Sequence, residues 1–120
     1  MEKEEILDFL LSLKEGDFFV VERKENVEPD DMPRFTGKMI ICFEGNFVEN
    51  SDGDNWHSAD SKFMINLVNE LRIRQNFGID AIHNNVRKAS ISEIFTLIER
   101  VHRSGYVYNR KSMKLTKINP

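Results

Sequence analysis

Residues 104–120 read SGYVYNRKSMKLTKINP, and the prediction of the fold starts from this stretch. All its charged side chains are cations: Arg110, Lys111, Lys114 and Lys117. After Gly105, apolar residues recur at every second position, which is the period of a strand with one buried face. The stretch therefore predicts an amphipathic β-hairpin with a cationic tip.

The register of this hairpin depends on its turn. With Arg110 and Lys111 as the turn pair, Tyr108 faces Met113, and the apolar side chains share one face. An Arg-Lys pair is not a favoured two-residue turn, so a longer loop over 109–112 is the alternative.

A helix is predicted over 90–103, directly before the hairpin. Its first residues, S-I-S-E, form a capping box in which the Ser90 hydroxyl and the Glu93 carboxylate each accept a hydrogen bond from a helix-start amide. Apolar side chains then recur at helical spacing. The predicted buried stripe is Ile91, Ile94, Phe95, Ile98 and Val101.

Two more helices are predicted before residue 90, over about 60–76 and 79–88. Apolar residues between Phe63 and Leu71 are spaced to bury one face of the first helix. In the second predicted helix, Ile79 and Val86 lie on one side of the helix.

The first half of the chain predicts a helix over 2–15, which ends at Gly16, followed by a small antiparallel sheet. The predicted strands are 18–21, 38–44 and 47–49, with a tight turn at Gly45-Asn46 between the last two. The predicted fold class is α+β, in which this helix and sheet pack on a C-terminal helical unit that ends in the hairpin.

At 120 residues, the chain is expected to form a single domain, 1–120. Residues 1–60 carry 16 acidic and 6 basic side chains, whereas residues 61–120 carry 4 acidic and 11 basic ones. The domain thus has an acidic part, 1–58, and a basic part, 59–120. Either the two parts neutralise each other, or the basic part faces an external polyanion.

The order of helix, short helix, capped helix and basic hairpin resembles the winged helix-turn-helix family of nucleic-acid-binding domains. The resemblance covers residues 60–118 and rests on that order and on the sequence ISEIFTLIERVHRSGYVYNRKSMKLTK. It implies that helix 90–103 is a recognition helix and that the hairpin is a phosphate-contacting wing. Glu93 and Glu99 on the polar face of that helix count against DNA binding, because phosphates repel carboxylates. Dimerisation or protein docking is the alternative use of such a domain.

The favoured function is a non-catalytic regulatory or accessory protein, such as a transcription regulator, that binds nucleic acid. The predicted contact residues are Arg87, Lys88, Arg100, Arg103, Arg110, Lys111, Lys114 and Lys117. The alternative is a protein-interaction module or inhibitor that docks on a basic partner through an acidic surface with Glu28, Asp30 and Asp31. A homodimer is also compatible with the sequence.

The densest candidate for a metal site is the polar cluster Asp52, Asp54, His57 and Asp60. Counted from Asn50, however, the cluster lacks the glycine and the glutamate that a calcium loop requires at its sixth and twelfth places. We therefore expect neither an enzyme nor a cofactor or metal site.

No apolar run approaches the ~18 residues that a membrane-spanning helix requires, and the acidic start MEKEE is unlike a secretory signal. A cytoplasmic protein is expected. The lone cysteine, Cys42, lies in the apolar run MIICF and is expected to be a buried small side chain.

Overall fold

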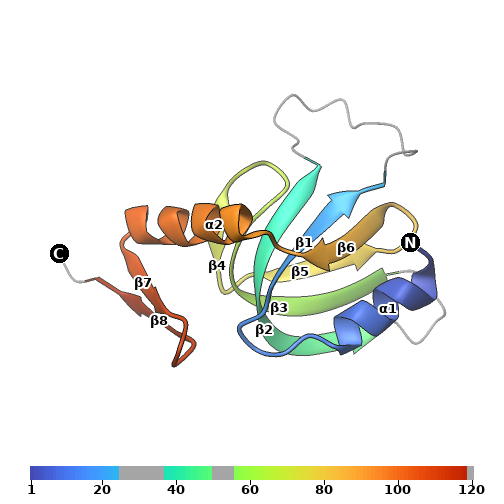
Figure 1. The fold of residues 1–120 in the computed structure, drawn as a ribbon, viewed down its shortest axis with the longest axis horizontal. Coiled ribbons are helices and arrows are strands. Elements are labelled where there is room, and N and C mark those ends of the chain that lie inside the picture. Colours follow the sequence, from blue (N-terminus) through green and yellow to red (C-terminus); the bar gives the residue numbers. More distant parts are fainter. Residues whose placement is uncertain (25–36, 50–55, 119–120) are drawn as a thin grey trace.

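A curved antiparallel sheet runs through the centre of the structure, a computed structural model that describes residues 1–24, 37–49 and 56–118 (Figure 1). The strands are β1 (Phe18–Arg23), β2 (Lys38–Glu49), β3 (Trp56–Ile65), β4 (Leu71–Ile73), β5 (Asn76–Asp80) and β6 (Asn84–Lys88). Their order is β4-β3-β2-β1-β6, and β5 pairs with β3 as well. Because β6 pairs with β1, a single sheet contains strands from both halves of the chain.

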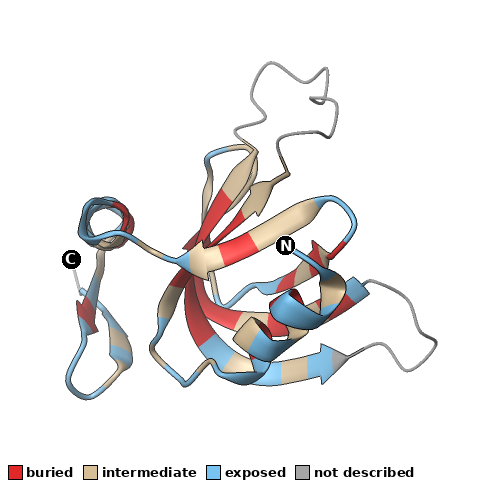
Figure 2. Cartoon of the chain, turned by 45° about the vertical axis from the view of Figure 1, so that its right-hand side comes forward, coloured by how far each residue is buried: buried red, intermediate tan, exposed pale blue. Residues whose placement is uncertain are grey.

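Strand β1 carries apolar side chains on both of its faces, as a strand at the centre of a covered sheet requires. Phe19 and Val21 belong to one buried cluster and Val20 to another, because successive side chains point to opposite faces. Figure 2 shows the buried residues concentrated along the central strands. The sheet therefore has a hydrophobic core on each side.

One core lies under the N-terminal helix α1 (Lys3–Leu11). Ile6 and Leu10 of this helix are buried against a cluster that includes Phe19 and Ile41 of the sheet. Figure 1 shows α1 at the right of the molecule, close to the N-terminus.

The other core lies under helix α2 (Ile91–Arg103) and the hairpin of β7 (Tyr106–Asn109) and β8 (Lys114–Lys117). Leu97 and Val101 of α2 pack there with Val20, Cys42, Phe63 and Tyr108, among others. In Figure 1, α2 and the hairpin lie together at the left.

The predicted fold class is wrong, because the C-terminal helical unit is replaced by strands. Residues 60–76, predicted as a helix, belong to β3, β4 and the start of β5, and residues 79–88 belong mainly to β5 and β6. Of the winged-helix order, the described residues contain only α2 and the hairpin. Neither helix of the described chain, of 9 and 13 residues, is long and apolar enough to cross a membrane.

The misassigned helix 60–76 has a physical explanation in β3. Residues 61–65 are all buried, since one face of β3 packs under α1 and the other under α2. Only Phe63, Met64 and Ile65 of this segment are apolar, and such a short run, buried on both faces, has no period that separates a strand from a helix. The side chain of Asn66 then accepts hydrogen bonds from the amides of Val68 and Glu70, and Asn69 has a φ of 62°, so the chain turns back into β4.

The predicted turn at Gly45-Asn46 is also wrong, because β2 is one strand from Lys38 to Glu49. Its pairing with β3 is irregular between Phe43 and Val48. Gly45 has a φ of 146° and Asn46 a φ of 55°, conformations that favour these two residue types. The turn signal in the sequence therefore marks a bulge.

Local signals in the second half are confirmed. Helix α2 starts at the Ser90 cap, with both hydrogen bonds of the capping box in place. The hairpin is present, but Tyr108 faces Leu115 and the loop spans 110–113, which has the length of the predicted alternative loop 109–112 and is shifted by one residue. In the first half, α1 ends at Leu11, before the predicted end at residue 15.

Candidate nucleic-acid interface

Arg87, the first of the predicted contact residues, is engaged in ion pairs within the protein. Its guanidinium donates two hydrogen bonds to the Glu93 carboxylate, at 2.7 and 2.8 Å, and a third to Glu22 at 3.1 Å. Lys38 donates to the same Glu93 carboxylate at 2.9 Å. Arg87 holds the pKa of Glu93 well below its usual range, and Glu93 in turn raises the pKa of Arg87. This network joins β6, α2, β1 and β2.

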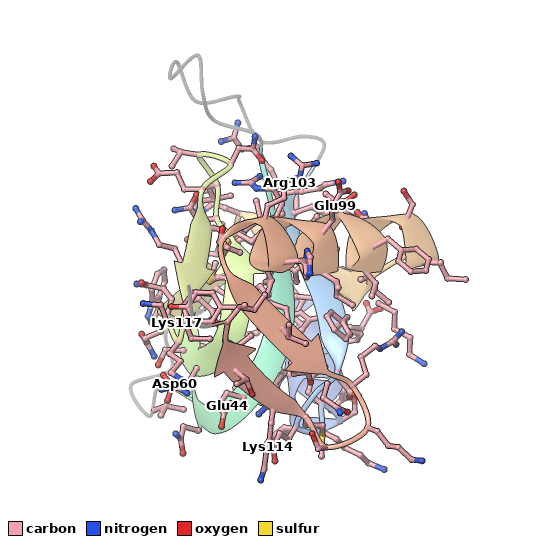
Figure 3. All side chains as sticks on the ribbon, turned by 90° about the vertical axis from the view of Figure 1, so that its left-hand side faces the viewer. Glu44, Asp60, Glu99, Arg103, Lys114 and Lys117 are labelled. Carbon is pink, nitrogen blue, oxygen red and sulfur yellow. The ribbon has the colours of Figure 1, made fainter. Side chains whose placement is uncertain are left out.

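The two predicted arginines at the C-terminal end of α2 also have partners within the chain. Arg100 donates to the backbone carbonyl of Asn69 at 3.0 Å and to its side-chain oxygen at 3.3 Å. Arg103 forms an exposed ion pair with Glu99 on the same helix, and both side chains lie at the outer side of α2 in Figure 3. This ion pair lies on the surface because α2 buries its opposite side against the sheet.

Lys88 and Arg110 converge with Lys14 on a cleft of about 580 Å³. Lys14 follows α1, Lys88 ends β6, and Arg110 lies at the tip of the hairpin, so three separate segments contribute one cation each. Within the described part of the chain, none of the three forms an ion pair. The apolar lining is Phe9, Leu13, Phe18, Ala89 and Ile94.

Among the described residues that line this cleft, Asp17 is the one carboxylate. Its Oδ2 accepts a hydrogen bond from the backbone amide of Lys14 at 2.8 Å, which holds the turn between α1 and β1. The Arg110 guanidinium lies over the ring of Phe18, 5.4 Å from its centroid. A cation in this position is attracted to the electron-rich face of the ring.

Packing of the hairpin tip against the α1–β1 turn determines where Arg110 lies. The Asn109 side chain accepts hydrogen bonds from the amides of Lys111 and Ser112, at 2.9 and 3.0 Å, and so shapes the loop. Met113 and Tyr108 close over Gly16, where an added Cβ would lie 2.8 Å from the Met113 sulfur. The tip is thereby fixed beside the cleft.

The remaining predicted cations lie on the exposed side of the hairpin. Lys111 is next to Arg110 in the loop, whereas Lys114 and Lys117 lie on β8 (Figure 3). All three side chains are exposed. They form no ion pair with a described residue.

The described residues of the other predicted sites form no second cluster. Glu28, Asp30 and Asp31 lie outside the described residues, as do Asp52 and Asp54. His57 is buried against the ring of Phe47, with 5.7 Å between the ring centroids. The Asp60 carboxylate accepts hydrogen bonds from Asn46 and Asn76, which lower its pKa. In the described ranges, no three metal-ligating side chains come together.

Two features of this region differ from what the sequence predicts. Lys14 was not among the predicted contacts, because no sequence signal near Lys14 indicates that it lies close to Lys88 or Arg110. The predicted buried stripe of α2 is wrong in part, because Ile91 and Phe95 are 74% and 64% exposed. Figure 2 shows the exposed side of α2 in pale blue.

The buried positions of α2 are instead Glu93, Leu97 and Val101. Burial of a carboxylate here is possible because Glu93 receives hydrogen bonds from Arg87, Lys38 and Ser90.

Comparison of the chain with family models, with curated proteins and with solved structures found no match. The cleft and the hairpin are therefore the features that indicate a function.

Proposed function

We propose that this protein is a non-catalytic accessory factor that binds nucleic acid at the cationic cleft and the adjacent hairpin tip. The observation that carries the proposal is the convergence of Lys14, Lys88 and Arg110 on one cleft, where none of them has a carboxylate partner among the described residues. Lys111 extends this positive surface along the hairpin loop. Cations held in this way attract phosphates, which supply most of the affinity of non-specific nucleic-acid binding.

The form of the surface favours a single strand over the groove of a duplex. A duplex reader places polar side chains of a helix or ribbon against base edges. Here the exposed surface of α2 includes the apolar Ile91 and Phe95 and the carboxylate of Glu99, which is paired with Arg103, and Glu93 is used inside the protein. A cleft with cations at its rim and apolar walls instead suits a backbone that follows the charges while base faces rest on the walls.

The test is a titration of labelled single-stranded and duplex oligonucleotides at low salt, read by fluorescence anisotropy. We expect the single strand to bind more tightly, with log affinity falling by about 0.7 per log unit of salt for each phosphate neutralised. Arg110→Glu should weaken binding about tenfold or more, and Arg72→Glu, the same charge change on β4, should have little effect. Absence of binding by the unmutated protein would end the proposal.

A protein-interaction module is the second candidate function, and the exposed apolar side chains of α2 favour it. Ile91 and Phe95 lie one helical turn apart, so they form a continuous apolar patch. Self-association through α2 would bury the patch of both copies in an isologous interface. Light scattering after gel filtration tests this: a dimer that becomes a monomer in Phe95→Ser supports it, and a monomeric unmutated protein rejects it.

A further inference from the structure

We propose that a second groove, between the hairpin and the central sheet, binds an extended acidic peptide that adds to strand β8. This groove has a volume of about 580 Å³. Residues 113–116 of the hairpin form one side, and the opposite side is formed by Glu44, Asp60, Ser61, Lys62 and Arg74. Figure 3 shows Glu44, Asp60, Lys114 and Lys117 around β8.

Strand β8 has an open edge. It pairs with β7 from Lys114 to Lys117, and no other described strand pairs with it. The open edge of a ribbon presents backbone amides and carbonyls that an added strand satisfies, which is the basis of β-strand addition. An extended polypeptide supplies backbone amides and carbonyls in register with those on the edge of β8.

The charges that line the groove favour an acidic ligand. Both carboxylates are already engaged: Glu44 pairs with Lys62 at 2.9 Å, and Asp60 accepts hydrogen bonds from Asn46 and Asn76. Lys62 is itself held between Glu44 and Glu15, the latter at 2.7 Å.

Two lining cations remain without an ion pair among the described residues, Arg74 and Lys114. Both side chains are exposed. The half-buried side chains of Met113 and Leu115 add apolar surface beside them. The complementary peptide therefore carries carboxylates that reach Arg74 and Lys114. Apolar residues alternate with these acidic residues along the peptide.

Other occupants fit the groove less well. The backbone of a nucleic acid conflicts with the strand-edge requirement, because it has no alternating amides and carbonyls to pair along the open edge of β8. A second copy that paired β8 with β8 antiparallel would place the lysines of the two copies, Lys114 and Lys117, opposite each other, and like charges directly opposite destabilise a sheet. An acidic peptide avoids both conflicts.

The probe is a labelled peptide of about eight residues that alternates glutamate and valine, a length that covers β8 with residues to spare. It is titrated against the full chain. Two control peptides separate the contributions. The first replaces glutamate with lysine, and the second carries N-methyl groups on alternate amides, so that it keeps its charge but cannot pair along the strand edge. We expect at least about tenfold weaker binding of either control.

Two variants locate the site. Lys114→Glu and Arg74→Glu should each weaken the acidic peptide about tenfold, whereas Arg72→Glu should not change its affinity. Backbone amides of residues 114–117 should gain protection from hydrogen exchange when the peptide binds. Equal affinity for the N-methylated peptide, an unchanged affinity in Lys114→Glu, or dimerisation through β8 would overturn the proposal.

This inference does not rest on the proposed nucleic-acid binding, because it depends on Arg74 and Lys114, while the cleft depends on Lys14, Lys88 and Arg110. Each variant set therefore tests one site, and either proposal can fail alone.

Discussion

Arg87 and Glu93 form a bidentate ion pair in which two guanidinium nitrogens donate to the two carboxylate oxygens, at 2.7 and 2.8 Å. Glu93 also closes the capping box of α2. With Glu22 and Lys38, the pair joins charges of the acidic half of the chain to charges of the basic half. Some of the opposite charges of the two halves therefore neutralise each other in ion pairs within the protein.

Glu93→Gln is expected to destabilise the protein by about 2 kcal/mol, because it leaves Arg87 without its bidentate partner. The cost is moderate since the Arg87 and Lys38 side chains are 40% and 43% exposed, so water replaces part of the lost interaction. Urea denaturation measures the change. The matched control is Glu99→Gln, whose pair with Arg103 should contribute little to stability because both side chains are exposed and solvent screens their charges. Equal effects of the two substitutions would contradict the structural role of Glu93.

Acid should weaken the fold partly through the same carboxyl. Hydrogen bonds from Arg87 keep the pKa of Glu93 in the folded protein well below its usual value of 4.5. The unfolded chain therefore binds the proton more readily, so the stabilisation is complete above about pH 4.5 and is lost as the pH falls toward the folded pKa. Urea denaturation at pH 7 and pH 3 should show a larger loss for the unmutated protein than for Glu93→Gln. Parallel losses would show that other carboxyls cause the acid sensitivity.

Gly16→Ala is expected to lower stability by about 1–2 kcal/mol and to loosen the hairpin tip. Gly16 has a φ of 89°, and an added Cβ would lie 2.8 Å from the Met113 sulfur. Gly105→Ala is the matched control, because Gly105 has a similar φ of 90° and nothing within 4 Å of the added Cβ. Thermal melting of the two variants separates backbone strain from the clash. Identical shifts of Tm would show that Met113 moves aside without cost.

Cys42 should be unreactive in the folded protein. The residue is fully buried, and this burial raises the pKa of its thiol to about 12. Since the thiolate is the reactive form, a disulfide reagent at pH 8 should modify Cys42 only after denaturation. Reaction within seconds under native conditions would contradict the burial of β2 beneath the hairpin.

Elements with a local sequence signal were predictable. The Ser90 and Glu93 capping box defined the start of α2, and the change of apolar period after Gly105 defined the hairpin. Strand β3 was not predictable, because a strand buried on both faces has no alternation, and the turn that ends this strand depends on hydrogen bonds of one side chain, Asn66.

The candidate site was predictable in part for the same reason. Lys88 and Arg110 were identified by charge alone, but their proximity to Lys14 arises only when α1, β6 and the hairpin tip pack together. Arg87 was assigned to the same surface because its carboxylate partners, Glu22 and Glu93, lie on other elements. Net charge does not distinguish a cation that faces solvent from one that is paired across a sheet.

The position of β1 between β2 and β6 has a consequence during synthesis on the ribosome. Phe19 pairs with Lys88, so one edge of β1 stays open until residues 84–88 have left the exit tunnel. A nascent chain with β1 and β2 alone exposes an apolar strand to intermolecular pairing. Polypeptides truncated before residue 84 are thus expected to aggregate, and productive folding waits for the late arrival of β6.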